Sequence, residues 1–217
     1  MIERNIPVTT HGRYLVGETT TPQPPLLVGC HGYAEAAEHE FERINSIPGA
    51  ERWLRVSVQG LHRFYRGRSS DVVASWMTSQ DRLLAIADNC AYVSRVVESV
   101  AAEWSASSTL VFNGFSQGVA MAFRAAAASS LPVRAAIACG GDVPPELDST
   151  SLARIGAVLI GRGTRDEWYS EEKLSSDQKR LSDAGVRVQV VRFDAGHEWT
   201  QEFRQAAGEF LTYTQTS

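Results

Sequence analysis

The sequence predicts an α/β fold in which helices cover both faces of a mostly parallel sheet. Two observations support this prediction: short apolar runs recur along the chain, and stretches with helical periodicity separate them. Strands that alternate with helices favour βαβ crossovers, which place the strands in parallel. The length of 217 residues, with 43% hydrophobic and 21% charged residues, fits a single globular domain over residues 1–217.

Six near-continuous apolar runs indicate strands that are buried on both faces, as a parallel sheet requires. They are Pro25–Cys30, Trp53–Val58, Thr109–Phe112, Val133–Ala138, Ala157–Ile160 and Val186–Phe193. A further run, Tyr14–Gly17, is expected to add an antiparallel strand ahead of them.

The clearest helix follows from an apolar stripe between Leu83 and Trp104, whose members lie three and four residues apart. Thr78 and Asp81 resemble a capping box ahead of this helix. Apolar spacing predicts three more helices: one directly after Ser116, one over Glu171–Ala184 that ends at Gly185, and one over Glu198–Tyr213 that buries Trp199, Phe203, Ala206 and Phe210.

The pentapeptide GFSQG, with Ser116 at its centre, has the form G-x-S-x-G. It lies between a predicted strand and a predicted helix, which is the setting of a nucleophile elbow. Such a turn lifts the serine hydroxyl above the sheet, and small flanking residues let its strained backbone pass close to its neighbours. The alternative is an ordinary turn in which the serine caps the helix. We interpret Ser116 as a nucleophile.

A serine nucleophile needs a general base, which is usually a histidine. The chain has histidines at positions 11, 31, 39, 62 and 197. Only His197 fits the chain order nucleophile, acid, base, and it follows the last predicted strand, at the same sheet edge as Ser116. The alternative is a histidine in a surface loop.

Three aspartates follow predicted strands between Ser116 and His197, namely Asp142, Asp166 and Asp194. The spacing to both partners favours Asp166 as the acid of a triad. Asp142 would serve if the acid followed one strand earlier. Asp194 is only three residues from the histidine and is interpreted as a turn residue.

A second backbone N–H is needed beside the nucleophile to stabilise an oxyanion. The run Leu26–Cys30 leads into His31, Gly32 and Tyr33, where the glycine lets the backbone turn toward the nucleophile. The Tyr33 and Gln117 N–H groups are therefore predicted to form the oxyanion hole, with His31 bracing the loop. The alternative is an ordinary turn.

Together, HGY after the first core strand, GFSQG, the aspartate after AVLI and GH before the last helix resemble the α/β-hydrolase superfamily. Within it, GFSQG is similar to the elbow of the phospholipase/carboxylesterase family, which includes acyl-protein thioesterases and bacterial carboxylesterases. The resemblance implies a single-domain α/β-hydrolase fold. It also implies a triad of Ser116, Asp166 and His197, with Tyr33 and Gln117 as oxyanion donors. Relatives commonly read His-Gly-Leu-Gly-Asp where this chain reads HGYAE.

Two features bear on the substrate. Fourteen residues separate Gly141 from Gly156, too few for a cap domain, so an open site is expected. Aromatic residues on predicted sheet-edge loops either wall an acyl pocket or pack loops onto helices; they are Phe64, Tyr65, Trp76 and Trp168.

Charge and cysteine content limit the partners. A formal net charge of −4 argues against binding to nucleic acid. Locally, Arg63, Arg66 and Arg68 either meet an anionic group of the substrate or form a solvated face. The chain has no apolar run of ~18–20 residues and no signal-peptide pattern at its start, and its three cysteines form no CxxC pair. We expect a cytoplasmic protein without metal, cofactor or integral membrane association.

The residues therefore predict a metal-independent carboxylesterase that acts on small-molecule esters through an acyl-enzyme. An acyl thioesterase or a lysophospholipase would use the same triad. A non-catalytic binding protein of this fold would normally have lost one of the three triad residues, and this chain has all three.

Overall fold

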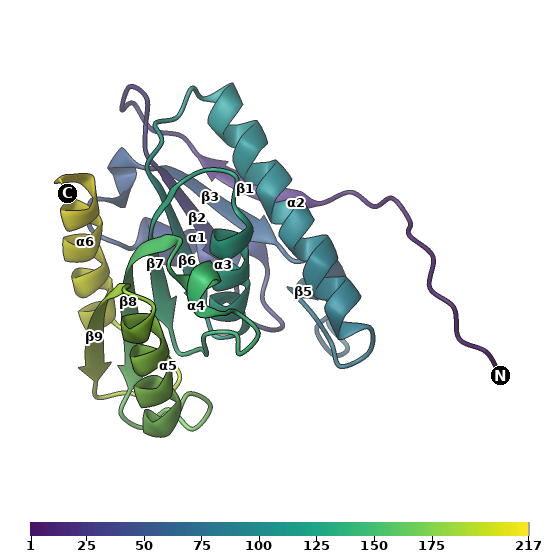
Figure 1. Cartoon of the computed structure of the whole chain (residues 1–217). Helices are drawn as coiled ribbons and strands as arrows, with labels where there is room; N and C mark the ends of the chain where they lie inside the picture. The colour runs from purple at the N-terminus through teal and green to yellow at the C-terminus, as the bar shows by residue number, and fades with distance from the viewer. Residues whose placement is uncertain (217) are drawn as a thin grey trace.

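The computed structural model describes residues 1–216 and confirms the expected α/β architecture (Figure 1). Its main sheet has the order β1 (Arg13–Gly17), β3 (Leu54–Gln59), β2 (Leu26–Cys30), β6 (Leu110–Phe115), β7 (Val133–Cys139), β8 (Ile155–Gly163) and β9 (Arg187–Phe193). Strand β1 runs antiparallel to β3, and the other strand pairs are parallel. All six predicted strands and the leading antiparallel strand are confirmed.

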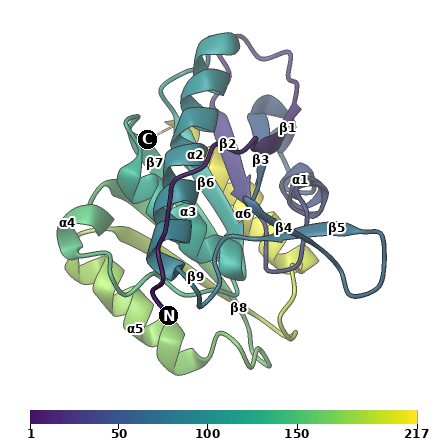
Figure 2. The ribbon, with the colours of Figure 1, turned by 90° about the vertical axis from the view of Figure 1, so that its right-hand side faces the viewer.

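Helices cover both faces of this sheet (Figure 2). One face is covered by α2 (Arg82–Glu103), α3 (Gln117–Ala128), α4 (Ser149–Leu152) and α5 (Glu171–Asp183). The other is covered by α1 (Ala37–Asn45), the short 3₁₀ helix η1 (Ala50–Arg52) and α6 (Gln201–Thr216). Helix α5 ends ahead of Gly185, whose φ of 79° supplies the expected left-handed termination.

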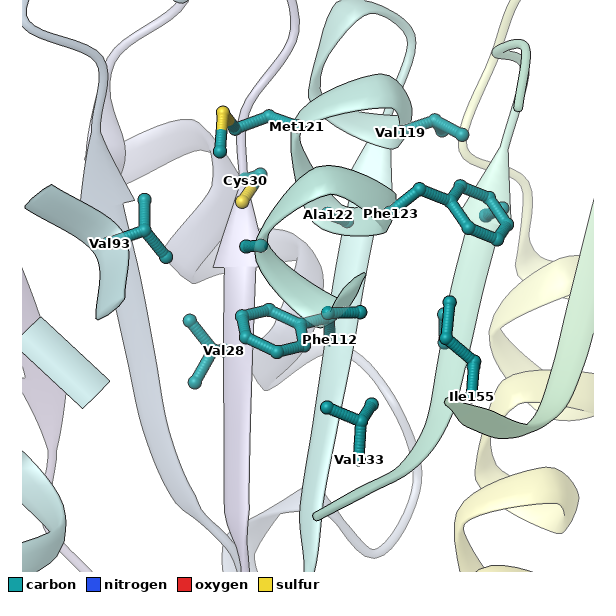
Figure 3. Close-up of a cluster of buried hydrophobic side chains, with 14 of the residues drawn as sticks. Val28, Cys30, Val93, Phe112, Val119, Met121, Ala122, Phe123, Val133 and Ile155 are labelled. Atoms are coloured by element: carbon teal, nitrogen blue, oxygen red, sulfur yellow. The ribbon is translucent and has the colours of Figure 1, made fainter. Parts of the chain in front are cut away.

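The core on the α2–α3 face is continuous from β3 to β8. Figure 3 shows side chains of α3, among them Phe123, packed over the strands, where Phe112 of β6 lies beside Val28 of β2. These three side chains are at most 1% exposed. Burying one such side chain stabilises the fold by roughly 1.5–3 kcal/mol. The packed layers hold the carboxyl ends of the strands as a rigid edge.

Three details of the predicted strands and helices are wrong. Strand β9 is not buried on both faces, because it is an edge strand and pairs only with β8. Thr78 forms no capping box: its hydroxyl donates to the carbonyl of Gln80, and α2 begins after Asp81, which has a left-handed φ of 50°. The last helix begins at Gln201, so that Trp199 lies in the loop ahead of it.

A two-stranded hairpin projects beside the main sheet and was not predicted. It consists of β4 (His62–Tyr65) and β5 (Val72–Ser75). Phe64 and Tyr65 therefore lie on a strand and not on a loop. Between β7 and β8 the chain forms only the four-residue helix α4, so no cap covers this edge of the sheet. Within residues 1–216, none of the helices combines the length and the apolar character needed to cross a membrane.

Candidate active site

The carboxyl ends of four parallel strands bring the predicted site residues to one edge of the sheet. Ser116 follows β6, Asp166 follows β8 and His197 follows β9, while the loop with Tyr33 follows β2. Since parallel strands end at the same edge, residues far apart in the sequence meet there, as in open α/β sheets generally.

Ser116 occupies a strained turn between β6 and α3. Its φ of 54° and ψ of −121° lie in a region that residues other than glycine rarely adopt, at a cost of roughly 1–3 kcal/mol. The turn is held by its N–H, which donates to the Cys139 carbonyl at 2.9 Å, and by its carbonyl, which accepts from the Val119 N–H at 3.0 Å. The backbone therefore has the conformation of a nucleophile elbow.

The glycines of GFSQG are required by close backbone contacts. A Cβ atom at Gly118 would lie 1.9 Å from the Cys30 carbonyl oxygen, and one at Gly114 would lie 2.5 Å from the Gly118 oxygen. The absence of side chains at both positions lets the first turn of α3 approach the end of β2. The elbow and the loop with Tyr33 are thereby packed together.

A buried aspartate, Asp166, pairs with the half-buried His197. The Asp166 Oδ2 atom lies 2.8 Å from His197 Nδ1, and the aspartate is 4% exposed. The other carboxylate oxygen, Oδ1, accepts the N–H groups of Trp168 at 2.8 Å and Tyr169 at 3.0 Å. The two loops are joined by a hydrogen bond from the Arg165 N–H to the Ala195 carbonyl at 2.9 Å. The carboxylate is thus fixed in position to orient the imidazole.

The two competing aspartates have other partners. Asp142 pairs with Lys173 at 3.2 Å, and Asp194 is a highly exposed partner of Arg165. Among the described residues, neither contacts His197 through a hydrogen bond or ion pair.

His197 also lies next to the elbow. Its ring centroid is 5.0 Å from that of Phe115, the residue directly before Ser116. Two glycines after β7 also lie close to these residues. A Cβ atom at Gly140 would lie 3.0 Å from the His197 Cε1 atom, and one at Gly141 would lie 2.3 Å from the Ser116 carbonyl oxygen. Within residues 1–216 no hydrogen bond joins the Ser116 hydroxyl to the imidazole; such bonds are often long in unliganded enzymes.

The predicted oxyanion donors are available. Within the described part of the chain, neither the Tyr33 N–H nor the Gln117 N–H donates to an acceptor. The Gln117 N–H stands at the first turn of α3, where the helix dipole favours negative charge. The Gln117 side chain has a separate role, because its Oε1 atom accepts the Trp76 N–H at 3.0 Å.

His31 braces the loop that carries Tyr33, as the sequence indicated. Its Nε2 atom accepts the Gly60 N–H at 3.0 Å, so Nδ1 carries the proton and donates to the Gly32 carbonyl at 2.7 Å. Burial lowers the pKa of His31 from 6.5 to about 4, although the bond to the Gly32 carbonyl opposes this shift. The ring is therefore neutral at pH 7.

This pKa predicts a pH-dependent stability. Because the unfolded chain binds the His31 proton at higher pH than the native protein, its contribution is present above pH 6.5 and is lost as the pH falls toward 4. The free energy of unfolding should drop by about 2 kcal/mol more between pH 7 and pH 5 in the parent than in His31→Gln. Urea titrations of both proteins at the two pH values measure this difference. Equal drops would contradict the assignment.

The four aromatic residues considered for an acyl pocket have different surroundings. Trp76 is fully buried and stacks on His31 with ring centroids 5.0 Å apart, so the packing alternative holds for this residue. Phe64 packs against the Tyr33 ring at 5.8 Å. The exposed side chains Tyr65 and Trp168 complete the aromatic set.

The arginines of the hairpin contact backbone carbonyl groups. Arg66 donates to the Ala34 carbonyl at 3.0 Å, and Arg63 donates to the His11 carbonyl. Two of the three arginines thus hold neighbouring segments together. The third, Arg68, is exposed on the hairpin turn.

The cysteines are free thiols, and burial raises the pKa of each, so they are protonated at pH 7. No group of three or more His, Cys, Asp or Glu side chains in residues 1–216 is arranged to hold a metal ion.

A charged group that no sequence pattern indicated lies behind the Tyr33 loop. Glu35, Glu40 and Arg43 lie there, joined by hydrogen bonds. Ala37, Phe41 and Ile44 have helical spacing and could have indicated α1, but no pattern shows that Glu40 and Arg43 of this helix turn away from solvent.

Comparisons with known proteins agree with the fold described above. The phospholipase/carboxylesterase family model matches residues 71–215, which include Ser116, Asp166 and His197 but not Tyr33. A Bacillus cereus carboxylesterase superimposes with a TM-score of 0.72 at 16% identity, covering 94% of each chain. The Zea mays acyl-protein thioesterase 2 also gives 0.72 at 16% identity, covering 94% of this chain and 99% of the other. Esterase PE8 gives 0.69 at 22% identity, covering 95% and 100%. Among curated protein sequences there is no match.

Proposed function

Because the chain belongs to the phospholipase/carboxylesterase family of α/β-hydrolases, we propose that it is a serine hydrolase that cleaves carboxylic esters. The observation that carries this proposal is the Asp166–His197 pair, 2.8 Å between Oδ2 and Nδ1 and with a buried carboxylate, beside the strained turn at Ser116. A serine, a histidine and an acid in this arrangement are the parts that acyl transfer needs.

In the acylation step, the Ser116 hydroxyl attacks the ester carbonyl. His197 Nε2 takes the hydroxyl proton and returns it to the leaving alcohol, while Asp166 holds the Nδ1–H and stabilises the imidazolium. The N–H groups of Tyr33 and Gln117 donate to the oxyanion of the tetrahedral intermediate. Water then attacks the acyl-enzyme with His197 again as the base, which releases the acid and restores Ser116.

The open edge of the sheet favours small, water-soluble esters. The short connection between β7 and β8 leaves no room for a lid, so activation at a lipid interface is not expected. Tyr65 and Trp168 are 66% and 76% exposed and do not enclose a deep acyl tunnel.

A panel of p-nitrophenyl esters from C2 to C16 tests this function and its chain-length preference. We expect kcat/KM to be highest for C2–C4 and to show no jump at the critical micelle concentration. The same panel should include an acyl thioester and a lysophospholipid. A rate that climbs through C10–C16, or a preference for the thioester, would instead favour the thioesterase or lysophospholipase alternative. Absence of turnover on every substrate would overturn the proposal.

A further inference from the structure

Behind the Tyr33 loop lies a compact charged group that the mechanism above does not use. We call it the Arg43 cluster and define it as Glu35, Glu40, Arg43 and Phe115. The Arg43 side chain is 15% exposed, the Glu35 side chain 18%, and the Glu40 side chain is fully buried. The cluster therefore lies largely out of water, where charges act strongly on their neighbours.

On one side, the cluster holds the proposed oxyanion loop. Arg43 binds Glu35 through two nitrogens, with Nη1 at 2.7 Å from Oε2 and Nη2 at 2.5 Å from Oε1. The same Glu35 Oε2 atom accepts the Gly32 N–H at 2.7 Å, one residue before the Tyr33 N–H. A bidentate pair of this kind fixes the direction of the carboxylate as well as its charge.

The loop needs such a restraint because its backbone is strained. Ala34 has a φ of 56°, a left-handed conformation that costs a residue other than glycine roughly 1–2 kcal/mol. Two backbone hydrogen bonds with Ala74 hold the loop from one side. The Ala34 N–H donates to the Ala74 carbonyl at 3.0 Å, and the Ala74 N–H donates to the Glu35 carbonyl at 2.7 Å. The contact between Glu35 and Arg43 holds the loop from the opposite side.

On its second side, the cluster reaches the elbow and the histidine. The Arg43 guanidinium carbon lies 4.2 Å from the centroid of the Phe115 ring, which is cation–π distance. The Phe115 ring in turn lies 5.0 Å from the His197 ring. Arg43 therefore contacts, directly or through one side chain, the oxyanion loop, the residue before Ser116 and the proposed base.

We propose that Arg43 is a positioning residue for ester hydrolysis, which sets the Tyr33 N–H opposite the Gln117 N–H and fixes Phe115 against His197. The inference rests on the function proposed above and adds to it a residue from outside the triad. Its role is geometric: Arg43 contacts no reacting atom, and it acts through Glu35 on the loop and through Phe115 on the imidazole.

The charge states within the Arg43 cluster support a role for Arg43 that acts through Glu35. Burial raises the pKa of Glu40 to about 8, although Arg43 and the Asn113 amide oppose the shift. Burial also acts to raise the pKa of Glu35, but the hydrogen bonds and charge of Arg43 outweigh it and hold that pKa below its ordinary value. At pH 7 the guanidinium is thus balanced by Glu35, the carboxylate that binds the loop.

The test compares Arg43→Gln, Arg43→Lys and Glu35→Gln with Arg124→Gln. Arg124 of α3 is a matched control because it is also buried and paired, at 2.6 Å from Glu146, and because its side-chain contacts are to Glu146 and Met77 and not to the Tyr33 loop. With p-nitrophenyl acetate we expect Arg43→Gln to lower kcat about 10- to 100-fold while KM changes less than about 2-fold, because a misplaced donor weakens mainly the transition state. Arg43→Lys keeps the charge without the bidentate geometry and should fall between Arg43→Gln and the parent.

A trifluoromethyl ketone, which forms a tetrahedral adduct with an activated serine, provides a second readout. Its inhibition constant should rise in Arg43→Gln by about the same factor as kcat/KM falls, since both depend on the oxyanion donors. The double variant Arg43→Gln/Glu35→Gln should be no worse than the more damaged single variant, as expected for residues that act as a pair. Arg124→Gln should keep the parental kcat and inhibition constant.

A purely structural role gives a different result. The inference is overturned if Arg43→Gln keeps the parental kcat and inhibition constant at a temperature where it is folded, or if the double variant shows additive losses. Should Arg43→Gln fail to fold, Glu35→Gln and Arg43→Lys carry the same comparison. Failure of the proposed function is distinguishable, because the parent would then be inactive or its activity would survive the loss of Ser116.

Discussion

Replacement of Ser116 by alanine is expected to lower kcat for ester hydrolysis by several orders of magnitude, up to ~10⁶-fold, and to abolish labelling by a fluorophosphonate probe. The side chain is removed from a turn whose other contacts are made by the backbone: its N–H bonds to the Cys139 carbonyl and its carbonyl to the Val119 N–H. The variant should therefore fold like the parent. Steady-state rates, probe labelling and circular dichroism together measure the outcome.

Ser105→Ala is the matched control for this experiment. Ser105 is an exposed serine that also has a positive φ, 48°, but it lies at the end of α2. It should keep parental activity and labelling. If Ser116→Ala retains more than a few per cent of activity with an unchanged spectrum, the nucleophile has been assigned to the wrong residue.

Asp166→Asn is expected to reduce kcat by up to ~10⁴-fold. The reason lies in the hydrogen bonds of the carboxylate. Oδ1 accepts the N–H groups of Trp168 and Tyr169, so the asparagine oxygen should take that place and turn its NH₂ group toward His197 Nδ1. The imidazole would then carry its proton on Nε2 and could not accept one from Ser116.

Asp142→Asn and Asp194→Asn serve as controls for this substitution. Their partners are Lys173 and Arg165, both on the surface, and each change should cost much less activity. Measuring kcat for the three variants side by side decides between the candidates. A severe loss in Asp142→Asn with a nearly normal Asp166→Asn would assign the acid to the loop after β7.

The strands and the triad candidates could be predicted because their signals are local. A buried parallel strand is a short apolar run, and GFSQG combines a strand end, a tight turn and a helix start within a few residues. The chain order nucleophile, acid, base then reduces the five histidines to His197 and the candidate acids to those between Ser116 and His197. Spacing along the chain favours Asp166 over Asp142, but spacing does not show a contact. The structure shows one, between Asp166 Oδ2 and His197 Nδ1.

The Arg43 cluster could not be predicted, because it depends on contacts between elements far apart in the chain. Glu40 binds the Asn113 side chain, 73 residues away, and looks in the sequence like an ordinary charged residue of a surface helix. The sequence leaves the place of Trp76 open for a similar reason, since only the tertiary structure shows that its ring stacks on His31. Strand β9 has an apolar composition, but its position at the sheet edge leaves part of it in water.

The two proposed oxyanion donors are backbone groups, and this affects how the site can evolve. The Tyr33 side chain is 60% exposed, so drift at this position can change the residue without removing the N–H, proline excepted. Position 117 tolerates fewer substitutions, because the side-chain amide of Gln117 accepts the Trp76 N–H. The position whose residue type this part of the site constrains most is therefore a neighbour, Gly118, where any side chain would push α3 away from Cys30. A lineage could lose the hole without altering either donor residue.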